Sequence, residues 1–274
     1  MPDSLEAAKA KAAATYNAAA DRFDAPPLSF WHRIGSRTVE RLAPAPGATL
    51  LDVGCGTGAS ALPAARAVGP EGRVIGVDLA GAMLERARGK AEALGLRNAA
   101  FRTGDMTDLG FAEASFDAVV CVFAIFFVPD MEAQVARLWR LVRPGGHLAV
   151  TTWGPEPLEP GGRAFWDAVR FIRPDLVADF RPWDRITEPE AVTRLFLDGG
   201  AAAPEVAAEA GVQPLERVED WWTIALGAGF RGTVDLLSAE EARQVREANL
   251  TRLRLEGVTE VRANAIYAVA RKPL

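Results

Sequence analysis

Short apolar runs and helical patterns take turns along the middle of the chain. The runs lack the strict alternation of half-exposed strands and predict buried strands at residues 49–53, 73–77, 99–102, 116–122 and 147–152. Helical patterns between them predict helices at about 59–67, 80–94 and 131–142. Such alternation is typical of a parallel sheet covered on both faces, which right-handed crossovers make doubly wound.

Less regular segments flank this block. Residues 3–20 and 28–42 predict two helices, and the second half predicts a helix at 189–197, a strand at 205–210, a mostly helical stretch at 215–255 and a strand-like run at 261–271. We therefore expect an N-terminal helical cap at 1–46 and an α/β core at 47–153. Residues 154–274 would complete the sheet, with lid segments at about 154–187 and 212–258.

Composition excludes several classes of protein. The chain is 49% hydrophobic and 24% charged, as expected of a globular protein and not of a disordered or collagen-like one. Its net charge of -5 disfavours a nucleic-acid partner. Two cysteines and two histidines are too few for a Cys/His metal site. Neither a signal-peptide pattern nor an apolar run long enough for a bilayer is present, so we expect a cytoplasmic protein without a membrane partner.

A glycine-rich loop follows the first predicted strand. Gly54, Gly56 and Gly58 stand between that strand and a helix, where backbone N–H groups face a polar ligand. Asp78 ends the next strand and is placed to accept from both hydroxyls of a ribose. Gly54, Gly56 and Ala59 also match a dinucleotide fingerprint, so the loop by itself leaves the cofactor open.

Neighbouring motifs favour one cofactor. LDVGCGTG, GVDLAGAMLERAR, Thr103-Gly104-Asp105-Met106, FDAVVCVFAIFFVPD and LVRPGGHLAVTTW occur in order between residues 47 and 153. Together they resemble the class I S-adenosylmethionine-dependent methyltransferases, especially the ubiquinone/menaquinone C-methyltransferase-like group. The closing AIYAVARK is similar to the antiparallel seventh strand of that family. The resemblance implies a seven-stranded, mainly parallel Rossmann-like methyltransferase fold, with S-adenosylmethionine as cofactor and S-adenosylhomocysteine as product.

The resemblance also implies roles for individual residues. The loop from Gly54 to Gly58, including Cys55 and Thr57, would line the methionine part of the cofactor, and Asp52 would brace this loop. Asp78 would bind the ribose. The remaining implied cofactor contacts are Leu79 and Met106 beside the adenine, Asp105 as acceptor from its amine, Cys121 and Phe123 at the amino acid end, and Tyr16 and Thr38 from the cap.

The acceptor site should lie where the lids reach the sheet. In open parallel sheets ligands bind beyond the carboxyl ends of the strands, and both lid segments start from that edge. These segments and the cap are rich in tryptophan, which favours an apolar or aromatic small-molecule acceptor. Candidate acceptor contacts are Trp31, Phe127, Trp153, Trp183 and Trp222. Ile125-Phe126-Phe127 stands where the family often has polar residues, which fits an apolar acceptor or a methylation that needs no protein base. His32, beside Trp31 in the cap, is the candidate base.

A methyltransferase acting by in-line displacement is the function that these patterns favour, with C- or O-methylation preferred. Two alternatives stay open. One is a protein that binds S-adenosylmethionine without catalysis, consistent with the apolar Ile125-Phe126-Phe127 segment. The other is an NAD(P)-dependent oxidoreductase using the same glycine loop.

Overall fold

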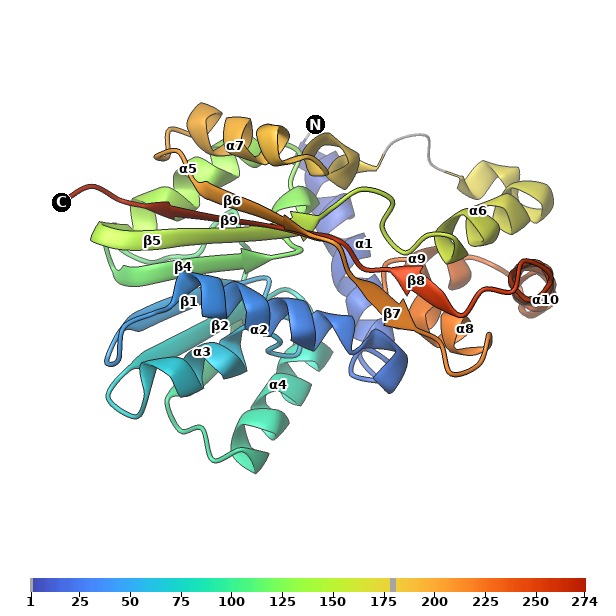
Figure 1. Cartoon of the computed structure of the whole chain (residues 1–274), viewed down its shortest axis with the longest axis horizontal. Helices are drawn as coiled ribbons and strands as arrows, with labels where there is room; N and C mark the ends of the chain where they lie inside the picture. The colour runs from blue at the N-terminus through green and yellow to red at the C-terminus, as the bar shows by residue number, and fades with distance from the viewer. Residues whose placement is uncertain (1, 178–180) are drawn as a thin grey trace.

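A seven-stranded sheet runs through the centre of the computed structural model, which describes residues 2–177 and 181–274 (Figure 1). The strand order is β3-β2-β1-β4-β5-β9-β6. Strands β1 to β5 are parallel to one another, and β9 is antiparallel to both β5 and β6. The strands are β1 Thr49–Val53, β2 Arg73–Asp78, β3 Ala99–Thr103, β4 Phe116–Val122, β5 Val142–Trp153, β6 Glu205–Glu209 and β9 Ala265–Arg271. This topology confirms the predicted fold class.

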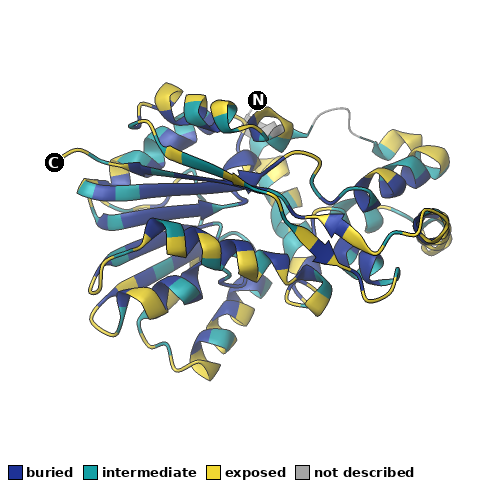
Figure 2. Ribbon diagram, viewed as in Figure 1, coloured by how far each residue is buried: buried dark blue, intermediate teal, exposed yellow. Residues whose placement is uncertain are grey.

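Helices cover both faces of the sheet. Helices α2 and α3 pack together on one face, α5 and α7 pack together on the other, and α4 packs on β2 and β3. These helices are α2 Phe30–Leu42, α3 Ala61–Val68, α4 Gly81–Ala93, α5 Met131–Leu141 and α7 Pro189–Asp198. Figure 2 shows the central strands buried and the exposed residues on the outer sides of the helices. Covering on both faces explains why β1 and β4 are largely apolar, each with a single aspartate, and do not alternate with polar residues.

Two predicted boundaries are wrong. Strand β5 begins at Val142 and runs through Pro144-Gly145-Gly146, five residues earlier than expected. The strand-like run at 261–271 is two strands, because the chain turns at Asn264, whose side chain donates to the Pro155 carbonyl and accepts from the Gly211 N–H. Strand β8 (Glu260–Arg262) therefore leaves the main sheet and pairs with β7 (Val212–Pro214).

The remaining elements gather beyond the carboxyl ends of the parallel strands, where α1 crosses the end of the sheet (Figure 1). Helix α1 contacts α4 and α9, and α6 packs on α10. They are α1 Pro2–Ala19, η1 Pro26–Leu28, η2 Ile125–Phe127, α6 Gly161–Ile172, η3 Pro174–Leu176, η4 Pro182–Ile186, α8 Asp220–Leu226, α9 Arg231–Val234 and α10 Ala239–Leu255. Within residues 2–177 and 181–274, no helix combines the length and the hydropathy needed to cross a membrane.

Candidate functional site

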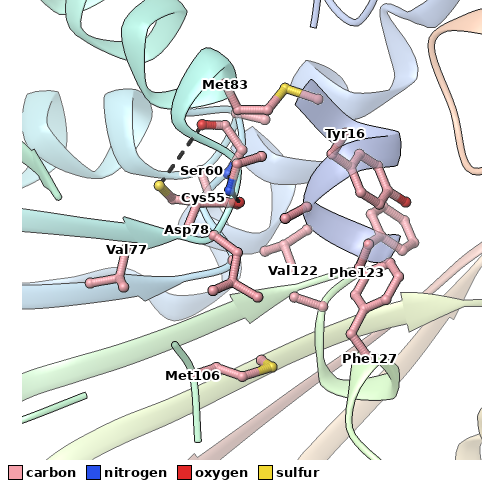
Figure 3. A pocket seen from close by; sticks show the side chains of 18 of the residues that line it. Tyr16, Cys55, Ser60, Val77, Asp78, Met83, Met106, Val122, Phe123 and Phe127 are labelled. Atoms are coloured by element: carbon pink, nitrogen blue, oxygen red, sulfur yellow. Dashed lines mark hydrogen bonds between the residues drawn. The ribbon is translucent and has the colours of Figure 1, made fainter. Parts of the chain in front are cut away.

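A cavity of about 130 Å³ opens at the carboxyl ends of β1, β2 and β4. We call it the glycine-loop cavity. Tyr16, Phe123 and Phe127 stand on one side of it, across from Val77 and Cys55 (Figure 3). The full wall is Ala12, Ala13, Tyr16, Phe23, Trp31, Gly54, Cys55, Gly56, Ala59, Ser60, Val77, Asp78, Leu79, Ala80, Met83, Gly104, Met106, Val122, Phe123, Ala124 and Phe127. Parallel strands thus bring the first and second sequence motifs to one place.

The turn after β1 requires glycine at position 54. Gly54 has a φ of +71°, and a Cβ atom built there would lie 2.3 Å from the Cβ of Ala124. Only a residue without a side chain allows this left-handed turn and this approach to the end of β4. The loop backbone consequently forms part of the cavity wall.

Asp78 is held by the loop that it faces. Its Oδ2 accepts from the Gly56 N–H at 2.8 Å and its Oδ1 accepts from the Ala80 N–H at 2.9 Å. Burial raises the pKa of Asp78, while these backbone donors act to lower it. An ionised carboxylate has about four lone-pair sites, so two stay available to a ligand in the cavity.

Asp52 lies directly behind the wall. Its side chain is fully buried, and its Oδ2 accepts from the Ser60 hydroxyl at 2.6 Å, whereas its Oδ1 has no partner among the described residues. Burial raises the pKa of Asp52 to about 7, although the hydrogen bond from Ser60 acts to lower it. Asp52 therefore touches the cavity only through Ser60, as a brace for the loop would.

Asp105 is at the rim of the cavity and outside its wall. Its Oδ2 pairs with Lys9 of α1 at 2.6 Å, and its Oδ1 accepts from the N–H and hydroxyl of Thr107. Burial acts to raise the pKa of Asp105, but the bonds from Lys9 and Thr107 prevail and hold it below its usual range. The flanking Gly104 and Met106 do line the cavity.

Phe123 has an unusual backbone at the end of β4. Its φ is +53°, a left-handed conformation that costs a bulky residue about 1–2 kcal/mol. Its N–H donates to the Thr151 carbonyl at 2.8 Å, and its ring lies 4.3 Å from the Trp153 ring and 5.2 Å from the Trp31 ring. Strand pairing and aromatic packing together hold the Phe123 ring between two cavities.

The second cavity, of about 300 Å³, is the tryptophan cavity. It shares Ala12, Tyr16, Trp31, Phe123 and Phe127 with the glycine-loop cavity. The rest of its wall is Ala8, Lys11, Thr15, Phe126, Trp153, Pro157, Leu158, Gly162, Trp166, Arg181, Trp183, Ala228, Gly229 and Phe230. Both predicted lid segments contribute, the first with Trp166 and the second with Phe230.

Eight predicted cofactor residues line the glycine-loop cavity: Tyr16, Gly54, Cys55, Gly56, Asp78, Leu79, Met106 and Phe123. Four predicted acceptor residues line the tryptophan cavity: Trp31, Phe127, Trp153 and Trp183. Their grouping brings together segments that are far apart in the sequence.

Other predicted residues are absent from both walls. Thr57 donates to Asp24, and the Thr38 hydroxyl bonds with that of Thr151 at 2.8 Å. Cys121 is fully buried. The remaining predicted residues outside the walls are Asp52, Gly58, Asp105, Trp222 and His32.

The structure corrects the predicted roles of His32 as a base and Trp222 as an acceptor contact. His32 is exposed on α2, so the structure does not bring the candidate base to either cavity. Trp222 packs against Phe165, with 6.2 Å between ring centroids, as part of the lid's own core. Successive tryptophans of a helix point in different directions, which composition alone does not reveal.

From α1 the sequence analysis named only Tyr16 and missed the rest of its contribution. Ala8, Lys11, Ala12 and Thr15 follow the i, i+3, i+4, i+7 spacing of one helix face and line the tryptophan cavity. Phe23, Met83, Phe126 and Phe230 were missed as well. The spacing of these residues indicates one face of a helix, but residues as small as alanine do not indicate what that face packs against.

Comparison with known proteins identifies the core. Residues 50–146 match the family model described as "Methyltransferase domain". Together with the sheet order and the cavity at the glycine loop, this match decides the family. Residues 50–146 form a methyltransferase domain. The resemblance seen in the motifs is confirmed, and S-adenosylmethionine is the cofactor of this family.

Relatives of this methyltransferase domain act on different molecules. Nocamycin O-methyltransferase of Saccharothrix syringae is 36% identical over 192 residues, which are 70% of this chain and 62% of that protein. Demethylmenaquinone methyltransferase of Oceanobacillus iheyensis is 34% identical over 139 residues, 51% of this chain and 58% of that protein. The chain thus spans about three fifths of the length of these curated relatives.

Solved structures share the fold. A protein from Bacillus halodurans C-125 that carries a methyltransferase assignment superposes with a TM-score of 0.58 at 20% identity. The match covers 88% of this chain and 99% of the other. The likeness therefore extends well beyond residues 50–146 of the methyltransferase domain and includes most of the sheet.

Proposed function

We propose that this protein transfers a methyl group from S-adenosylmethionine to a small apolar or aromatic acceptor, on carbon or oxygen. One observation carries the proposal. The glycine loop and the Asp78 carboxylate line one cavity, which shares an aromatic wall with a second, larger cavity. A cofactor and an acceptor in these two spaces would meet at Tyr16, Trp31, Phe123 and Phe127.

The glycine-loop cavity fits the cofactor by the chemistry of its wall. Asp78 retains lone pairs for ribose hydroxyls, because only one backbone N–H is bonded to each of its oxygens. Leu79, Met83 and Met106 offer apolar surface to an adenine. Asp105 is occupied by Lys9 and Thr107, so we assign it to the rim and to holding α1 in place.

When bound, the cofactor would supply a methyl group on a positively charged sulfur. The acceptor would attack the methyl carbon in line with the carbon–sulfur bond, and the sulfur would leave as a neutral thioether. The chain's own residues exclude water and align the acceptor. Tyr16 packs edge-on against Phe127 at 5.6 Å between ring centroids, and Phe123 packs against Trp31. These contacts make a dry junction between the two cavities.

The described walls of the two cavities contain no histidine or glutamate. Burial raises the pKa values of Tyr16 and Cys55, so neither side chain is ionised near neutral pH. We assign the free lone pairs of Asp78 to the ribose hydroxyls, away from the acceptor. The acceptor would therefore attack in a form that is already nucleophilic, without a proton being taken by a protein base.

Calorimetric titration of the purified protein tests the proposal. S-adenosylmethionine and S-adenosylhomocysteine should bind with micromolar affinity, whereas NADH and NADPH should give no heat. A response to the nicotinamide compounds alone would favour an oxidoreductase. Binding of the adenosyl compounds without turnover on a panel of aromatic acceptors would favour the non-catalytic alternative. The cytoplasmic location and the lack of a nucleic-acid partner stay predictions from composition.

A further inference from the structure

The tryptophan cavity combines an aromatic wall with positive charge. Lys11 and Arg181 line it, and no Asp or Glu occurs in its described wall. This is unusual for a chain with a net charge of -5. Lys11 is exposed and the Arg181 side chain is 41% exposed, so both charges stand at the solvent side of this apolar space. There they favour an anion whose rings enter the cavity.

Lys11 is available to a ligand. It forms no ion pair with any described residue, and it faces the cavity from the same side of α1 as Ala12 and Thr15. Lys9 lies two residues earlier, on the opposite side of α1. Its Nζ pairs with Glu6 at 2.8 Å and with Asp105 at 2.6 Å. The two lysines of α1 therefore have different roles, one holding the helix and one facing the cavity.

Arg181 is loosely paired. Its Nε lies 3.9 Å from Oδ2 of Asp184, at the outer limit of an ion pair, and its charge also acts on Glu159. A guanidinium has five N–H donors, so these weak contacts leave donors for a ligand. Arg181 belongs to the first lid segment and Lys11 to the cap, so one anion held by both would join the two.

We propose that the acceptor is an aromatic anion whose rings occupy the tryptophan cavity and whose negative group pairs with Lys11 and Arg181. Tryptophan and phenylalanine rings would stack against its ring system, and its charge would set its direction. The proposal rests on the proposed function, since it names the substrate class of that same site.

The test compares an aromatic acid with its uncharged ester. Protein saturated with S-adenosylhomocysteine is titrated with 2-naphthoate and with methyl 2-naphthoate. The acid should bind at least about tenfold more tightly, the scale of one charge-assisted hydrogen bond. Lys11→Met combined with Arg181→Met should remove the difference, and Lys11→Arg should keep it. Arg170→Met is the matched control, because Arg170 belongs to the same lid but pairs with Asp167 outside the cavity.

Each result decides the matter. Selectivity for the acid that survives the double substitution would overturn the assignment to these two residues. Anion recognition would be overturned if acid and ester bound equally well, if the ester bound more tightly, or if neither bound. The proposed function would still stand in these cases, provided that S-adenosylhomocysteine binds. Selective binding of the acid by a protein that binds neither adenosyl compound would support anion recognition and overturn the proposed function.

Discussion

Replacing Asp52 by asparagine should change how the stability of the protein depends on pH. Asp52 is fully buried, its Oδ1 has no partner among the described residues, and burial raises its pKa to about 7 from an ordinary value of 3.8. A carboxyl group with a raised pKa in the folded state binds its proton more tightly there than in the unfolded chain. Its contribution to stability is therefore complete below pH 3.8 and is lost as the pH rises towards 7.

The size of the effect follows from the two pKa values. A difference of about three units corresponds to about 4 kcal/mol of lost stability once the pH exceeds both values. Between pH 5 and pH 8 the wild-type protein should lose about 3 kcal/mol more than Asp52→Asn. The asparagine retains an oxygen for the Ser60 hydroxyl but does not titrate. In Ser60→Ala the loss of stability should continue to higher pH, because the hydrogen bond from Ser60 acts to lower the pKa of Asp52.

Urea unfolding at several pH values measures this difference. The free energy of unfolding of the wild type and of Asp52→Asn is extrapolated to water at each pH, and the gap between them is plotted. A gap that stays constant from pH 5 to pH 8 would refute the reasoning, since it would mean that Asp52 carries its charge in the folded core.

Three further predictions concern the glycine-loop cavity. Asp78→Ala should weaken S-adenosylhomocysteine binding by about 1.5–3 kcal/mol, the scale of a hydrogen bond to a charged group; unchanged affinity in calorimetry would contradict the ribose assignment. Gly54→Ala should lower the free energy of unfolding by at least about 1–3 kcal/mol, because φ at this position is +71° and an added Cβ atom has no room. Gly89→Ala, on the open surface of α4, should instead stabilise by about 1 kcal/mol, and equal effects of the two would refute the strain argument. Cys55 and Cys121, whose pKa values burial raises, should react slowly with a thiol reagent at pH 8 until urea is added, and fast native labelling would contradict their burial.

Much of the core was predictable from the sequence. The bounds of β1 and β4 were predicted to the residue, because a strand buried on both faces is a mostly apolar run without strict alternation, bounded by turn residues. Gly54 and Asp78 could be predicted as cavity residues because a glycine turn and a carboxylate at the end of a strand are visible in the local sequence. The doubly wound sheet was predicted from the same alternation and the antiparallel last strand from the family resemblance, and β9 confirms the latter.

Tertiary structure alone decided which side chains face the cavities. Asp105 and Thr38 have suitable positions in the sequence, but their polar atoms are taken by Lys9 and Thr151, which lie 96 and 113 residues away along the chain. The tryptophan cavity depends on α1, the two lid segments and the left-handed Phe123 meeting at one end of the sheet. Local pattern reports whether a residue prefers a strand, a helix or a turn. Which distant partner satisfies or buries it is settled by packing, where many weak contacts compete for the same space.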